Sequence, residues 1–272
     1  MKNFVYFDIL VQAMEKISVS DKLLFKFRAE PQTLIFEGYC RFVSGVTLYN
    51  EGEDYALLSP FNNGASVHCC LYSANTDFID KVVNLFKCDT AEFCAVSPFV
   101  TEYLKTRFDF EWETNCDLFV WNGKPLKREP KCKIGTIGSD YAQTISDGTH
   151  YHADLDDIKK CLLLHPSAAA YVDGKPVCWC LLHQEGSLGM LYTVPEYRRR
   201  GYALEVMTAL VQQVAERGDV PFAYIVRDNV ASQNLAAKYN MEKVCRADYF
   251  EINLNGSKQN QSIAGEKLCG TK

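Results

Sequence analysis

The sequence feature that most constrains the fold is a strand, a basic loop and a helix in direct succession. Residues 188–194 have the pattern of a buried strand, and residues 201–217 repeat apolar side chains with the helical period of about 3.6. Between them lies a loop that begins at Pro195. A helix N-terminus offers unpaired N–H groups and the positive end of the helix dipole, so it favours an anion. The predicted pyrophosphate-binding residues are Arg198, Arg199, Arg200, Gly201, Tyr202 and Ala203.

A purely structural role explains these arginines poorly. Three cations at a helix start oppose the dipole, at a cost of roughly 0.3–1 kcal/mol each when exposed. Gly201 lets the backbone approach a ligand closely, because it has no side chain. The loop has no Gly-Lys-Ser/Thr sequence and only one glycine, so it is neither a Walker loop nor a dinucleotide-binding loop.

The alternation of elements around this loop predicts an α/β (α+β) fold. The second part of the chain reads as a hairpin, the loop helix, and a strand–helix–strand ending. Its expected elements are the strands 168–172, 175–183, 222–227 and 244–254 and the helices starting at Asp154 and Ser232. The first part reads as helix 5–17, extended segment 33–48, strand 66–72, a helix after Asn75, strand 91–96, helix 99–105 and strand 117–121.

Composition shifts predict four segments. Residues 1–125 form an N-terminal α/β domain, and residues 126–132 form a polar linker rich in basic residues and proline. Residues 133–254 form the domain that carries the loop, and residues 255–272, poor in apolar side chains, form a mobile tail.

Charge and cysteine content exclude several function classes. A net charge of −5 argues against broad nucleic-acid binding, and no apolar run approaches the roughly 20 residues of a membrane helix. The N-terminus has Asp8, Glu15 and Lys16 and does not read as a secretory signal. The 12 cysteines then read as reduced thiols of an intracellular protein, with the cytoplasm favoured and a mitochondrial location as the alternative. No metal is expected, because His150 and His152 have no further ligands at metal spacing.

Two motifs carry a resemblance to a known family. Arg198-x-x-Gly201-x-Ala203 resembles the (Gln/Arg)-x-x-Gly-x-(Gly/Ala) loop of the GNAT acyltransferase superfamily. The runs 176–179 and 194–198 resemble the glycine N-acyltransferase family in particular. The similarity covers residues 133–254, and residues 1–125 resemble that family's degenerate N-terminal half only through size and alternation. The resemblance implies a GNAT fold in the C-terminal half, preceded by a degenerate GNAT-like α/β half.

The resemblance also implies an acyl-coenzyme A co-substrate and its contacts. The strand before the loop would be splayed from its neighbour and would pair with the pantetheine arm through Tyr192, Thr193 and Val194. The loop would hold the pyrophosphate, and Asn229 and Ser232 would face the thiol end. Capping of the following helix explains Asn229 and Ser232 equally well.

The chain departs from the family at two positions where chemistry is expected. Ser187 stands where the resemblance implies a glutamate base, and Ala236 stands where it implies a tyrosine acid. Glu185 and His183 are the substitute candidates for the base, although an exposed hairpin turn also explains them. The implied function is acyl transfer from acyl-coenzyme A to the amine of a small acceptor, with glycine or another amino acid favoured. The alternatives are an acetyltransferase for a polyamine or protein amine, and a catalytically weak acyl-coenzyme A-binding protein.

Overall fold

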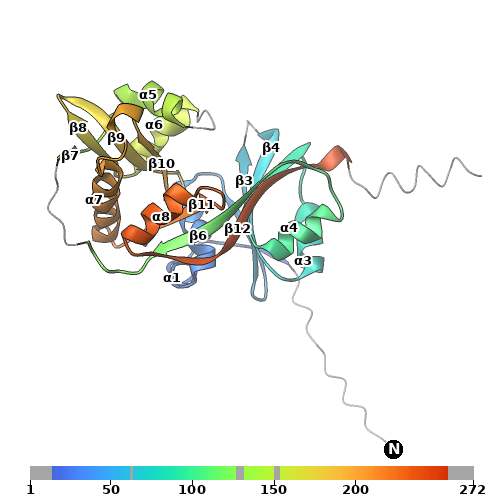
Figure 1. Ribbon diagram of the computed structural model, residues 1–272. Helices are drawn as coiled ribbons and strands as arrows, with labels where there is room; N and C mark the ends of the chain where they lie inside the picture. The colour runs from blue at the N-terminus through green and yellow to red at the C-terminus, as the bar shows by residue number, and fades with distance from the viewer. Residues whose placement is uncertain (1–13, 62–63, 127–131, 150–153, 257–272) are drawn as a thin grey trace, which may run out of the picture.

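The computed structural model describes residues 14–61, 64–126, 132–149 and 154–256. Its strands form an eight-stranded sheet in the order β1-β2-β3-β4-β5-β12-β6-β11 and a four-stranded sheet in the order β10-β9-β8-β7 (Figure 1). The strands of the larger sheet are β1 (Glu15–Ile17), β2 (Thr47–Glu51), β3 (Asp54–Phe61), β4 (Ser66–Tyr72), β5 (Thr90–Val96), β6 (Phe110–Trp121), β11 (Phe222–Val226) and β12 (Met241–Asn253). Those of the smaller sheet are β7 (Lys133–Gly135), β8 (Ala168–Val172), β9 (Lys175–Leu182) and β10 (Leu188–Thr193).

Helices cover both faces of each sheet. The helices α3 (Thr76–Val83) and α4 (Pro98–Lys105) pack on one face of the large sheet, and α1 (Asp21–Ala29) and α2 (Leu34–Phe42) pack on the other. On the small sheet, α5 (Ala142–Gly148) and α6 (Leu155–Leu164) lie opposite α7 (Tyr202–Glu216), and α8 (Val230–Lys238) follows β11. None of the described helices is long and apolar enough to cross a membrane.

The two longest strands join the halves of the chain. β12, the last strand, lies between β5 and β6 and is antiparallel to both. β6, from the first half, lies between β12 and β11. A strand of each half therefore pairs with strands of the other half: β12 with β5, and β6 with β11 and β12. Figure 1 shows β6 and β12 running from beside α8 to beside α4. The division into two domains stays a prediction, and residues 127–131 of the linker and 257–272 of the tail lie outside the described residues.

The predicted extended segment at residues 33–48 is wrong, because α2 makes most of it a helix. Its aromatic and β-branched side chains favour a strand locally. In the fold, Ile35, Phe36 and Tyr39 lie together in the core beside β2, β3 and β4, so tertiary packing overrides the local preference. The predicted helix at residues 5–17 also fails at its end, where β1 pairs with β2. Its first part lies outside the described residues.

Helix α2 contacts the hairpin that joins β9 to β10. A Cβ atom added to Gly38 would lie 1.7 Å from the carbonyl oxygen of Glu185. That distance is shorter than any real contact, so only glycine permits this approach. Helix α2 thereby fixes the hairpin backbone at Glu185, a residue that the sequence analysis singles out as a candidate base.

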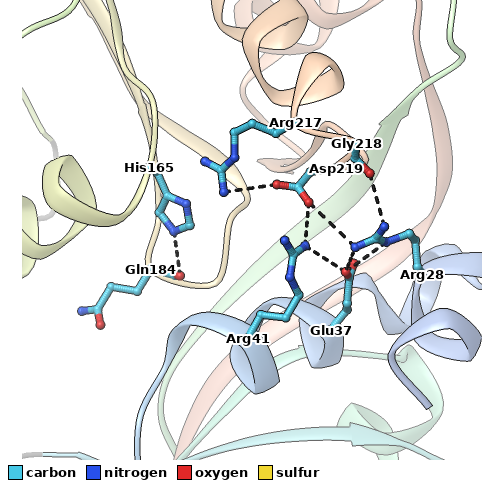
Figure 2. A network of polar contacts seen from close by, with 8 residues as sticks. All are labelled: Arg28, Glu37, Arg41, His165, Gln184, Arg217, Gly218 and Asp219. Atoms are coloured by element: carbon cyan, nitrogen blue, oxygen red, sulfur yellow. Dashed lines mark hydrogen bonds and ion pairs between the residues drawn. The ribbon is translucent and has the colours of Figure 1, made fainter. Parts of the chain in front are cut away.

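An ion-pair network holds the same helix against the end of α7 (Figure 2). The buried Glu37 accepts hydrogen bonds from Arg28 and Arg41. Arg41 Nη1 also lies 2.6 Å from Asp219 Oδ1, and Arg217 Nη2 lies 3.2 Å from Asp219 Oδ2. Because a buried carboxylate is costly without partners, these paired charges favour the docked arrangement.

The hairpin is anchored a second time by His165. Its Nε2 atom lies 2.9 Å from the Gln184 carbonyl oxygen, and its ring packs edge-on against Phe42 of α2 with centroids 4.6 Å apart. Burial lowers the pKa of His165, so the neutral ring is favoured in the folded protein. Contacts from both halves therefore set the position of residues 183–187.

Candidate functional site

The predicted splayed strand lies at the edge of its sheet. β10 is the last strand of the four-stranded sheet and β11 is the last strand of the eight-stranded one, so two unpaired strand edges flank the space between the sheets. The pairing of β10 with β9 shifts register between Gly189 and Tyr192, and Met190 has a positive φ of 51°. Such a bulge frees backbone groups from the ladder and is common beside functional sites.

The basic loop directly follows β10 and leads into α7. Arg199 and Gly201 have φ angles of 65° and 91°, a left-handed conformation that is found in anion-binding loops. Among the described residues, no backbone carbonyl accepts from the amides of residues 199–203. The first acceptor in the helix is the Gly201 carbonyl, which serves Leu204 and Glu205. The helix thus begins with uncapped N–H groups, as an anion site requires.

The arginines differ in what they contact. Arg198 Nε donates to the Thr193 carbonyl at 2.9 Å, which holds the loop to the end of β10. The Arg200 guanidinium lies 5.3 Å from the Tyr197 ring centroid. All three arginine residues are exposed, so their charges are available to a ligand. In contrast, helix α3 of the first half begins with a capped end, where the Asn75 side chain accepts from Asp77 and Phe78.

A cavity of about 780 Å³ is lined by residues from both halves of the chain. Its wall from the second half includes residues 187–191 of the β10 region, β11 and α8. This cavity brings together all three predicted base candidates, His183, Glu185 and Ser187, with Asn229 and Ser232. The loop arginines are not among its lining residues.

The three base candidates form a compact group at the hairpin. Ser187, only 2 % exposed, donates its hydroxyl hydrogen to Glu185 Oε1 at 2.5 Å. A Cβ atom on Gly189 would lie 2.0 Å from His183 Nε2, so the histidine ring lies directly over the bulged strand. Serine at position 187 therefore orients the carboxylate two residues earlier. Glu185 is the candidate in this group whose charge suits proton acceptance.

The residues of α8 take structural roles that the sequence analysis left open. The exposed Asn229 caps the helix by accepting from the Ser232 amide at 3.0 Å. Ala236 and Tyr239 both line the cavity and are 3 % and 2 % exposed. Burial raises the pKa of Tyr239 well above its ordinary value, which disfavours ionisation.

Buried thiols do not supply a nucleophile in this region. Every cysteine in the described ranges is a free thiol. Cys178 and Cys180 are in the core against α7, as packing residues of β9. Burial raises the pKa of Cys178 to about 12, so the thiol stays protonated at neutral pH. Within the same ranges no group of three or more His, Cys, Asp or Glu residues could hold a metal ion, and His150 and His152 lie outside them.

The sequence analysis missed the part of the cavity wall that the first half supplies. His68 on β4 and Glu92 on β5 are register partners in a parallel pair, with His68 Nε2 3.4 Å from Glu92 Oε2. The Tyr39 hydroxyl lies 3.5 Å from His68 Nδ1. These residues come from three separate elements, and no local motif links them. Only the pairing of β4 with β5 and the docking of α2 bring them together.

The second half of the chain is similar in sequence to known proteins. A family model described as FR47-like protein matches residues 172–250. Glycine N-acyltransferase from Homo sapiens is 30 % identical over 127 residues, covering 45 % of this chain and 42 % of the relative. The enzyme of that name from Pongo abelii is 27 % identical over 127 residues, which also cover 45 % of this chain and 42 % of the relative. The matched region thus spans less than half of these curated relatives.

Solved structures match the whole arrangement. A Drosophila protein aligns with a TM-score of 0.69 at 13 % identity, covering 89 % of this chain and 99 % of that one. A tandem GNAT protein from the clavulanic acid biosynthesis pathway aligns with a TM-score of 0.55 at 10 % identity, covering 89 % and 98 %. A putative GNAT acetyltransferase from Novosphingobium aromaticivorans aligns with a TM-score of 0.52 at 13 % identity, covering 85 % and 96 %.

The chain is therefore a GNAT-fold protein with two GNAT-like halves. The order strand–helix–strand–helix–strand occurs in both, as β4-α3-β5-α4-β6 and as β10-α7-β11-α8-β12. Within this fold, the second half of the chain is similar in sequence to glycine N-acyltransferases.

Proposed function

We propose that this protein transfers an acyl group from an acyl-coenzyme A to the amine of a small acceptor. The observation that carries the proposal is the start of α7, where no backbone carbonyl of the described residues accepts from the amides of residues 199–203 and three arginines are exposed. Charge-assisted hydrogen bonds to a pyrophosphate there would contribute about 1.5–3 kcal/mol each. The pantetheine arm would run along the edge of β10 at Tyr192–Val194 toward the cavity.

The chemistry fits the groups at the bulge. The acceptor nitrogen would attack the thioester carbonyl, and backbone N–H groups freed from the ladder near Met190 would stabilise the oxyanion. Glu185, oriented by Ser187, would take the ammonium proton directly or through water and His183. The carbon–sulfur bond then breaks, and water protonates the thiolate, since Ala236 offers no acid. Direct attack is favoured over a cysteine acyl-enzyme because the neighbouring thiols are buried and protonated.

Two kinds of acceptor are compatible with this machinery. The relatives are named for glycine, which supports glycine or another amino acid. A polyamine or protein amine is the alternative, and acidic side chains in the cavity support it. A protein that binds acyl-coenzyme A with weak catalysis is the third candidate, supported by Ser187 and Ala236 in place of the implied glutamate and tyrosine.

The proposal is tested by thiol release from a panel of acyl-coenzymes A with a panel of amines. We expect release with at least one amine, and Glu185→Gln to lower kcat/KM about 100-fold, because a general base contributes on the order of 10²–10⁴. The affinity for coenzyme A should not change. Glu216→Gln, at an exposed position on α7, is the matched control. Tight acyl-coenzyme A binding without release by any amine would instead identify a binding protein.

A further inference from the structure

The charged groups of the cavity are of one sign. Its described lining includes three carboxylates, on Glu92, Asp157 and Glu185, and includes no lysine or arginine. Asp157 is already paired, with Lys160 Nζ 2.9 Å from its Oδ1 atom. Glu92 and Glu185 remain, and the ion pairs of the described residues give neither of them a lysine or arginine partner. The described lining of the cavity therefore holds two carboxylates that no lysine or arginine of the described residues neutralises.

The two carboxylates face a common region from opposite halves of the chain. Glu92 lies on β5 of the large sheet, and Glu185 lies on the hairpin of the small one. Burial is the main cause that raises the pKa of the Tyr39 hydroxyl, and both Glu185 and Glu92 raise it further. Tyr39 and both carboxylates line the same cavity. Glu92 has a histidine beside it, since His68 Nε2 lies 3.4 Å from Glu92 Oε2.

Aromatic rings form much of the remaining wall. Phe61 stacks on His68 with ring centroids 4.3 Å apart. The rings of Tyr224 and Tyr249 pack edge to face with centroids 5.6 Å apart. The Tyr224 hydroxyl is buried and has no hydrogen-bond partner among the described residues. Carboxylates and aromatic faces together attract alkylammonium groups. The Phe, Trp and Tyr residues of the lining are Tyr39, Phe61, Trp112, Tyr224, Tyr239 and Tyr249.

We propose that the acceptor is a cationic amine without a carboxylate, of the diamine class, held between Glu185 and Glu92. Its reacting nitrogen lies at Glu185, which takes the proton, and its second ammonium group lies at Glu92. This inference rests on the proposed acyl transfer. An amino-acid acceptor would place its own carboxylate beside Glu92 and Glu185, in a cavity whose described lining has no lysine or arginine, so like charges would repel.

Three acceptors of equal length isolate the charge effect. 1,4-Diaminobutane, 4-aminobutan-1-ol and 4-aminobutyrate differ only in the group at the far end. With acetyl-coenzyme A we expect kcat/KM to fall in that order, with the diamine about 100-fold above the amino acid, because a like charge at close range is strongly unfavourable. Glycine is included as the acceptor for which the relatives are named.

A pair of variants localises the recognition. Glu92→Gln should reduce the ratio of kcat/KM for the diamine to that for the amino alcohol about tenfold, because one charged partner is lost. Coenzyme A affinity should be unchanged in this variant. Glu102→Gln removes an exposed carboxylate from α4 outside the cavity and should leave the ratio unaltered.

Binding is measured separately, so the acceptor site is tested even without turnover. 1,4-Diaminobutane is titrated calorimetrically into the wild-type protein saturated with coenzyme A, and 4-aminobutyrate is titrated in parallel. Tighter binding of the diamine, weakened by Glu92→Gln, supports the inference. A kinetic preference for glycine or 4-aminobutyrate, or equal binding of the diamine and 4-aminobutyrate, overturns it. Thiol release that favours amino acids would leave the proposed acyl transfer intact, whereas diamine binding with no thiol release would overturn the transfer alone.

Discussion

Replacing Gly201 with valine should weaken coenzyme A binding roughly 100-fold. Gly201 has a φ of 91°, which a β-branched residue adopts only with strain, and its amide lies among the unpaired donors at the start of α7. Losing two charge-assisted hydrogen bonds of about 1.5 kcal/mol each lowers affinity roughly 100-fold. Isothermal calorimetry with coenzyme A measures the change.

The control for this variant is Gly174→Val. Gly174 also has a positive φ, of 77°, but lies in the β8–β9 turn, where an added Cβ would contact nothing within 4 Å. This variant carries comparable backbone strain and should bind coenzyme A like the wild type. If Gly201→Val binds coenzyme A with unchanged affinity, then the loop at residues 198–203 does not bind the pyrophosphate.

Gly38→Ala should destabilise the protein and displace the hairpin that joins β9 to β10. In an exposed helix this change would stabilise by up to about 1 kcal/mol. Here the added methyl group would lie 1.7 Å from the Glu185 carbonyl oxygen, so α2 and the hairpin must separate. Overpacking of this kind costs typically about 1–3 kcal/mol. Urea denaturation should show a lower midpoint, and thiol release should fall with the displacement of Glu185.

Gly135→Ala serves as the matched change. Its Cβ would lie 3.5 Å from Tyr171, an ordinary contact, so stability should change little. If Gly38→Ala unfolds at the same or a higher urea concentration than the wild type, then the close approach between α2 and the hairpin is not what positions Glu185.

The sequence predicts the second half of the fold well because its signals are local. The Asp173–Gly174 turn, the period of α7 and the basic loop each depend on neighbouring residues alone, and the structure places the corresponding elements there. The candidate base group was found for the same reason, because the residues of the hairpin lie close together in the sequence.

Tertiary contacts decide the features that the sequence analysis missed. Helix α2 forms against a local preference for strand because its apolar side packs into the core. Gly38, which has no side chain, allows the hairpin backbone at Glu185 to lie against the helix. The insertion of β12 between β5 and β6 joins residues more than a hundred positions apart. His68 and Glu92 become cavity residues only through the pairing of two strands. No pattern within a short window of sequence contains this information.

Hydrogen–deuterium exchange of the wild-type protein with and without coenzyme A tests the central claim most directly. If coenzyme A lies along β10 with its pyrophosphate on the loop, its binding slows exchange in peptides that cover residues 188–194 and 199–203. The N–H groups at 199–203, which have no backbone acceptor among the described residues, should change most. Calorimetric binding of coenzyme A with unchanged exchange in both segments, and protection elsewhere, would contradict the account.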